Sequence, residues 1–137
     1  MIILVTGSRE FGSYDAVAWG LVHARKAFLS SEWETIVLRH GACSRKDPDT
    51  GDELSADMLA DLFVRKSMRG EWKIQARPAD WDTHGKAAGF LRNQAMLDEE
   101  LPDVCVAFLR KDLPCRGTRD MMERCYRVGV PVLAVSR

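Results

Sequence analysis

Glycine, serine and arginine stand together directly after the first apolar run of the chain, as Gly7, Ser8 and Arg9. A glycine turn at the start of a helix presents backbone N–H groups, and an arginine adds a cation, so this segment suits an anionic ligand. In the alternative interpretation, Gly7 only makes a turn and Arg9 is solvated. The segment is not the G-x-G-x-x-G sequence of dinucleotide-binding proteins, because the Arg9 side chain would block a pyrophosphate. His40 also stands where those proteins carry an acidic residue, so we exclude a nicotinamide-dependent oxidoreductase.

A second group of residues lies in positions 85–96, which contain two glycines and three alanines beside Arg92 and Asn93. Small residues such as Gly89 let a ligand or another backbone approach a helix closely. The guanidinium of Arg92 is suited to holding a phosphate or carboxylate through two hydrogen bonds. The alternative is a surface arginine that pairs with the acidic residues 98–99 of the same helix.

Two further loops carry residues suited to a nucleotide. Gly117 and Thr118 at a helix start offer N–H groups and a hydroxyl to a phosphate, although Thr118 would serve equally as a plain N-cap. Trp81 is suited to form the wall of a base-binding pocket, or else it is a core aromatic under the loop. Lys86 follows a glycine as in a P-loop, but Asp80 stands where the first P-loop glycine belongs, so we exclude an NTPase of that type.

The chain has four cysteines, none of them in a C-x-x-C pair: Cys43, Cys105, Cys115 and Cys125. Cys105 and Cys125 lie in apolar patterns and are expected in the core, whereas Cys43 and Cys115 lie in loops. A metal site built from the two loop cysteines with His40 or His84 is the alternative to reduced thiols, but the spacing matches no zinc pattern. We expect neither a metal nor a cofactor.

The elements that position these residues follow from the apolar patterns. Strands are predicted at residues 2–6, 35–39, 73–76, 104–109 and 131–135, and helices at residues 15–29, 55–68, 86–99 and 118–128. Ser55 and Thr118 are expected as N-caps and Gly129 as a C-terminal stop. Strict alternation of strand and helix predicts an α/β fold: one Rossmann-like domain, residues 1–137, with a three-layer open parallel sheet. The first apolar run is interpreted as a buried strand rather than a signal peptide.

The connections from strand to helix are long and contain the groups described above: residues 7–14, 40–54, 78–85 and 110–117. In an open parallel sheet these connections meet at the carboxyl edge of the strands, where ligands bind at the point of strand-order reversal. The sequence therefore predicts one site that brings all of these groups together.

Charge and hydropathy exclude several classes of protein. Among the 137 residues, 20 lysines and arginines balance 20 aspartates and glutamates, whereas a dedicated duplex-DNA binder usually shows a basic excess. A small phosphorylated ligand remains compatible, because one or two arginines are enough to hold it. No segment approaches the roughly 18 consecutive apolar residues of a membrane span. We expect a cytoplasmic protein.

Taken together, the segments around Gly7, His40–Gly41, Ser55-Ala56-Asp57, Trp81, Gly85–Met96 and Gly117–Thr118 resemble the YspA/YpsA-related branch of the SLOG superfamily, also called domain of unknown function 2493. The resemblance covers nearly the whole chain, in order. It implies a Rossmann-like sheet, a nucleotide-like ligand, a homodimer, and an origin in bacteria or phages. The ligand-binding residues that it and the loop chemistry indicate are Gly7, Ser8, Arg9, Gly41, Ala42, Asp57, Trp81, Gly89, Arg92, Asn93, Gly117 and Thr118.

Two departures from the resembled family bear on activity. The Lonely Guy phosphoribohydrolases of the same superfamily carry a glutamate three residues after the threonine, and Met121 stands there in this chain. A methionine cannot stabilise an oxocarbenium ion or activate water, and Glu123 lies on a different helix face. In addition, the polar residues 44–54 are inserted before Asp57, either as a lid or as an excursion without a role.

Three functions remain open from the sequence. The first is a binding module that senses or sequesters a nucleotide-derived phosphate ligand, and the alternative is an enzyme that cleaves an N-glycosidic or phosphoribosyl bond of nucleoside monophosphates. The candidate catalytic residues for that enzyme are Arg92, Asp80 and Glu123, with Glu10, Asp57 and Asp82 as further acids. The third is an interaction with protein or nucleic acid like that of the SLOG protein DprA, which the balanced charge disfavours for DNA.

Overall fold

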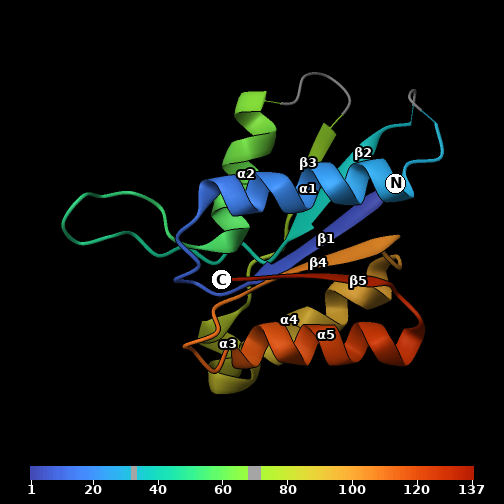
Figure 1. Cartoon of the computed structure of the whole chain (residues 1–137). Coiled ribbons are helices and arrows are strands. Elements are labelled where there is room, and N and C mark those ends of the chain that lie inside the picture. The colour runs from blue at the N-terminus through green and yellow to red at the C-terminus, as the bar shows by residue number, and fades with distance from the viewer. Residues whose placement is uncertain (32–33, 68–71) are drawn as a thin grey trace.

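The computed structural model describes residues 1–31, 34–67 and 72–137, and its centre is a parallel β-sheet (Figure 1). The strands are β1 (Ile2–Gly7), β2 (Ile36–His40), β3 (Trp72–Ala76), β4 (Val104–Leu109) and β5 (Val132–Ser136). Every pairing between them is parallel, in the order β3-β2-β1-β4-β5. The predicted α/β, Rossmann-like fold is confirmed.

Helices cover both faces of the sheet (Figure 1). The long helices are α1 (Tyr14–Phe28), α2 (Ala56–Ser67), α4 (Ala88–Glu99) and α5 (Arg116–Val128). Side chains alternate in direction along a strand, so β1 contributes to two separate cores. Ile3 and Val5 pack with α1 and α2, whereas Leu4 packs with Met96 of α4 and Met121 of α5. Burial on both faces explains why β1 and β4 are almost continuously apolar.

The structure corrects the helix boundaries at two places. The helix predicted from residue 118 begins at Arg116, and its N-cap is Cys115 in the left-handed conformation (φ 48°), so Thr118 lies inside the helix and is not the cap. Residues 81–84, predicted as loop, form the short helix α3 (Trp81–His84), which Asp80 caps by accepting the N–H of Thr83. A 3₁₀ turn, Gly85–Ala87, follows it, and α4 therefore begins at residue 88 rather than 86.

The expected N-cap of α2 and the expected C-terminal stop of α5 are present. Ser55 Oγ accepts the N–H of Met58, and Gly129 ends α5 with φ 78°. Residue 68, the predicted end of the second helix, lies outside the described residues. Within the described residues, no helix is long and apolar enough to cross a membrane.

The strand order reverses next to β1. The chain runs outward from β1 through β2 to β3, then crosses back to place β4 on the other side of β1. The carboxyl ends of β1 and β4 lie side by side, with Gly7 paired to Phe108. This is the position at which open α/β sheets bind their ligands.

Candidate functional site

A cavity of about 420 Å³ opens at the carboxyl edge of the sheet, beside this reversal of strand order. Its volume lies in the range of small-molecule sites. All but one of the predicted ligand-binding residues line it: Gly7, Ser8, Arg9, Gly41, Asp57, Trp81, Gly89, Arg92, Asn93, Gly117 and Thr118. The exception is Ala42, which has a left-handed backbone (φ 55°) and donates its N–H to His40 Nδ1. The predicted convergence of the loops at one edge is therefore confirmed.

The first loop is held rigidly between β4 and α2. Ser8 donates its N–H to the Phe108 carbonyl (2.9 Å) and accepts the N–H of Ala56 (3.1 Å). A Cβ on Gly7 would lie 2.4 Å from the Cβ of Ala56, so only glycine permits this approach of α2 to β1. The close packing places the first turn of α2, with Asp57, directly beside the end of the central strand.

Arg92 lines the cavity and is hydrogen-bonded to protein groups at its edge. Its Nη1 donates to the carbonyls of Gly41 (2.6 Å) and Arg77 (3.4 Å), and its Nε donates to Asn93 Oδ1 (3.2 Å). The alternative pairing with residues 98–99 is absent from these contacts, because Glu99 pairs with Arg77 instead (2.7 Å). Arg92 thus fastens α4 to the ends of β2 and β3 and contributes mainly its charge to the cavity.

Trp81 forms an exposed wall of the cavity rather than part of the core. Its side chain is about half exposed, and the guanidinium of Arg9 lies 5.5 Å from the ring centroid, within reach of a cation–π interaction. A Cβ on Gly89 would lie 3.4 Å from the ring, an ordinary van der Waals contact, so the indole packs against α4 at this residue. Phe90 adds a second exposed ring to the lining.

The first turn of α5 faces the same cavity through Arg116, Gly117 and Thr118. The N–H groups of a first helical turn have no acceptor within the helix, and the helix dipole adds positive potential there. Buried Asn93 of α4 fixes this turn, because its Nδ2 donates to the Gly117 carbonyl (3.2 Å) and to Asp120 (3.0 Å).

The charged side chains that line the cavity are mostly cationic. They are Arg9, Arg45, Lys86, Arg92 and Arg116, against the carboxylates Glu10 and Asp57. Arg45 pairs with Glu10 (3.1 Å), which leaves the remaining cations to set the potential. The electrostatics therefore favour an anion.

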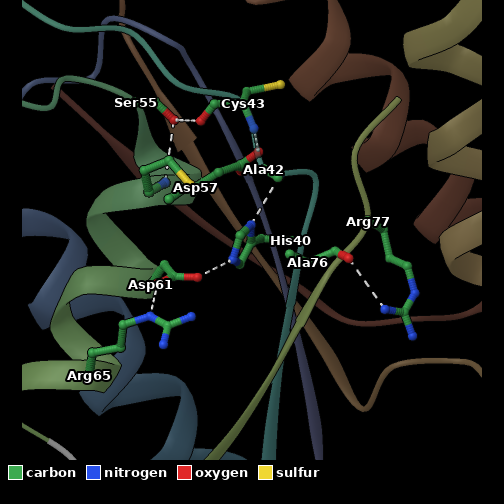
Figure 2. Close-up of polar contacts among 10 residues, drawn as sticks. His40, Ala42, Cys43, Ser55, Asp57, Asp61, Arg65, Ala76 and Arg77 are labelled. Carbon is green, nitrogen blue, oxygen red and sulfur yellow. Dashed lines mark hydrogen bonds and ion pairs between the residues drawn. The ribbon is translucent and has the colours of Figure 1, made fainter. Parts of the chain in front are cut away.

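Asp57 is the buried carboxyl of the cavity, and Figure 2 shows it beside the segment that follows β2. Its Oδ2 accepts the N–H of Cys43 (3.2 Å). Burial raises the pKa of Asp57 above its ordinary value, although His40, the Cys43 N–H and Arg92 oppose the shift.

A series of hydrogen bonds that runs through His40 and Asp61 to Arg65 lies beside the residues that follow β2 (Figure 2). His40 accepts the Ala42 N–H at Nδ1, which leaves Nε2 as the donor to Asp61 (2.8 Å), and Asp61 also accepts from Arg65. Burial by itself would raise the pKa of Asp61, but the hydrogen bonds from Arg65 and His40 hold it below its ordinary value. These hydrogen bonds fix the left-handed turn at Ala42 and, through it, the Cys43 backbone that Asp57 contacts.

Two of the candidate catalytic residues lie away from the cavity lining. Asp80 caps α3, and Glu123 pairs with Arg127 on the exposed side of α5 (3.5 Å). Of the further acids, Glu10 and Asp57 line the cavity and Asp82 does not. Met121 is fully buried in the core between β1 and α5.

Sequence reasoning missed Arg45, Lys86, Phe90 and Arg116 as cavity residues. Lys86 belongs to the 3₁₀ turn between α3 and α4, where the sequence predicts the first residue of a helix. Residues 44–54 form an excursion that is closed by a bridge between Lys46 and Glu53 and projects from the body of the molecule (Figure 1). From this segment, Arg45 reaches the cavity.

Cys43 and Cys115 both line the cavity, and neither forms a disulfide. Within residues 1–31, 34–67 and 72–137, no group of three or more His, Cys, Asp or Glu side chains has a placement suited to a metal ion.

Comparison with known proteins identifies a phage relative. The Gene 61 protein of Mycobacterium phage D29 is 45% identical over 134 residues, which cover 96% of this chain and 93% of the phage protein. No family model matches the chain, and no solved structure matches it.

Proposed function

This chain belongs to the family of the Gene 61 protein of Mycobacterium phage D29, and we propose that it binds a nucleotide or nucleotide-derived phosphate ligand, as a sensor or sequestering module. The observation that carries the proposal is the convergence of cations, an exposed indole and a helix start on one cavity at the strand-order reversal. Each of these features alone is common on protein surfaces. Together the cations and the helix start suit the phosphate of a nucleotide, and the indole suits its flat base.

The phosphate is assigned to the first turn of α5. The N–H groups of Gly117 and Thr118, with the nearby cations Arg116 and Lys86, provide donors and positive charge for it. The base is assigned to the Trp81 ring, and Arg9, whose guanidinium lies 5.5 Å from the ring centroid, adds a cation beside it. The resemblance to the SLOG superfamily supports the same class of ligand.

Binding without turnover agrees with the acids that are present. The position of the Lonely Guy glutamate is taken by Met121, which is buried in the core, and the lining carboxylate Glu10 is paired with Arg45. A methionine cannot activate water, and the ion pair holds the Glu10 carboxylate to another side chain.

The test is thermal denaturation of the purified protein with nucleoside mono- and diphosphates and ADP-ribose. A ligand at 100 times its Kd should stabilise the fold by about 2.7 kcal/mol. Arg9→Ala should abolish most of this stabilisation, whereas Arg127→Ala, which removes a cation from the exposed side of α5, should preserve it. No stabilisation by any member of the panel at millimolar concentration would refute the proposal.

Asp57 favours one alternative, hydrolysis of an N-glycosidic bond. A carboxyl whose pKa is raised by burial is suited to donate a proton to a leaving base. The alternative predicts release of free base from nucleoside monophosphates, detected by chromatography and lost in Asp57→Asn. Absence of released base after prolonged incubation would leave the binding role.

A homodimer and a cytoplasmic location complete the proposal. The exposed apolar side chains Leu91 on α4 and Tyr126 on α5 provide surface for self-association. Sedimentation velocity at micromolar concentration tests the dimer, and a monomer at all concentrations would remove this part of the proposal.

A further inference from the structure

We infer that Asp57 binds the vicinal hydroxyls of a ribose, so that the cavity selects ribonucleotides over 2′-deoxyribonucleotides. The inference rests on the proposed function and adds to it the class of sugar. Its basis is a buried carboxyl that lines the same cavity as the groups assigned to the base and to the phosphate.

Asp57 approaches the cavity from the layer opposite the phosphate and base groups. It belongs to the first turn of α2, which packs on one face of the sheet with α1 (Figure 1). The start of α5 and the ring of Trp81 belong to the layer on the other face. A ligand that fills the cavity from base to phosphate therefore presents its middle part, the sugar, toward the α2 wall.

The carboxyl of Asp57 has acceptor capacity beyond its backbone contacts. It accepts the N–H of Cys43, and the N–H of Gly41 opposes the rise of its pKa that burial causes, whereas a carboxylate offers about four lone-pair sites. Only 5% of the residue is exposed, so a ligand that displaces water here must donate hydrogen bonds or leave a buried acceptor unpaired. The like charge of a phosphate excludes it from this position.

The position of Asp57 brings a carboxyl close to the end of β2, where the strand itself has no acidic residue. Dinucleotide-binding folds carry an acidic residue there, and it accepts a hydrogen bond from the ribose 2′-hydroxyl. In this chain β2 ends at His40, and the carboxyl arrives from α2 instead. Asp57 accepts the N–H of Cys43, which is three residues after His40, the last residue of β2. The carboxyl therefore lies close to the end of β2. Two adjacent hydroxyls match the two oxygens of a carboxylate.

The experiment is isothermal titration calorimetry of the full chain with the common ribonucleoside 5′-monophosphates and their 2′-deoxy counterparts. Ribose 5-phosphate and 2-deoxyribose 5-phosphate form an additional pair that removes the base. Loss of one hydrogen bond to a charged acceptor should weaken the deoxy ligand roughly tenfold to a hundredfold. Asp57→Asn should weaken the ribonucleotide and reduce the difference between the two sugars.

The matched control is Asp15→Asn, which removes the first-turn carboxylate of α1, outside the cavity lining, and should keep the full discrimination. Equal affinity of the wild-type protein for ribo and deoxy ligands would overturn this inference and leave the proposed function standing. No binding of any ligand would overturn both. The comparison of sugars in the wild-type protein decides the question even if Asp57→Asn does not fold.

Discussion

Two glycine-to-alanine substitutions at the cavity should differ in their cost, although both introduce a severe steric overlap. A Cβ at position 41 would lie 2.2 Å from Nη1 and 2.5 Å from Cζ of Arg92. A Cβ at position 7 would lie 2.4 Å from the Cβ of Ala56 and 2.9 Å from that of Phe108. The atoms at position 41 are the tip of a flexible side chain, whereas those at position 7 are attached directly to backbone.

The expected magnitudes follow from what can move. In Gly41→Ala the guanidinium of Arg92 swings away and loses its 2.6 Å bond to the Gly41 carbonyl. Because Arg92 is only partly buried, water replaces part of that bond, and we expect a cost of about 1 kcal/mol. In Gly7→Ala the helix must move away from the sheet, which costs about 3 kcal/mol and lowers Tm by roughly 10 °C for a domain of this size.

Urea unfolding followed by circular dichroism measures both free energies, and calorimetry with the best-stabilising nucleotide measures binding. Gly41→Ala should remain folded with Tm within a few degrees of wild type and bind the nucleotide more weakly, because the displaced guanidinium takes up cavity volume. Gly7→Ala should have the lower free energy of unfolding of the two variants. If Gly41→Ala is as destabilised as Gly7→Ala, the assignment of Arg92 as the part that moves is wrong.

Three further substitutions test the supports of the site. Asn93→Ala removes the donor to the first turn of α5 and should lower the free energy of unfolding by about 1–3 kcal/mol in urea titrations. The pKa of Asp61 is depressed in the fold, so the unfolded chain binds more protons as the pH falls toward 3.8, and the stability from this carboxylate is present above that pH and lost below it. Asp61→Asn should therefore be less stable than wild type near pH 7, with a gap in Tm that closes on acidification. Gly129→Ala forces a side chain into φ 78° and should cost about 1–2 kcal/mol in thermal unfolding.

Matched positions make these tests decisive. Gln94→Ala, next to Asn93, removes a less buried amide that accepts from Arg124 further along α5, and it should cost less. Equal losses would contradict a special role for the contacts of Asn93 with the first turn of α5. A difference in Tm between wild type and Asp61→Asn that stays constant with pH would contradict the depressed pKa of Asp61. Gly117→Ala meets open space in a helix and should stabilise, so a loss there equal to that of Gly129→Ala would contradict the conformational argument.

The sheet was predictable because its central strands are buried on both faces and carry almost no polar residue. The start of α5 was not, because its cap is a left-handed Cys115, and a non-glycine residue gives no sequence signal for that conformation. The four residues of α3 are too few to show a helical period. Asp80 three residues before Thr83 was a usable capping signal for it.

The lining of the cavity was predictable from the rule that strand-to-helix connections meet at one edge. The partners of Arg92 were not, because the carbonyls of Gly41 and Arg77 lie 51 and 15 residues away and are brought together only by the crossover. A local view favours an acid on the same helix, and Glu99 was already paired with Arg77. For Ala42, the left-handed turn directs the residue toward His40 and away from the cavity.

The pairing of β1 with β4 has a consequence for folding kinetics. One wall of the cavity is formed by residues that precede the end of α2, and the other wall by residues that follow β3. Contacts such as the hydrogen bond from Ile2 N–H to Asp103 Oδ2 close a loop of about a hundred residues. Such a closure comes late in folding because its entropy must be offset by many contacts at once. A ligand seated between the walls would then leave the folding rate unchanged and slow unfolding, and it would protect the amides of all the central strands from hydrogen exchange to the same degree.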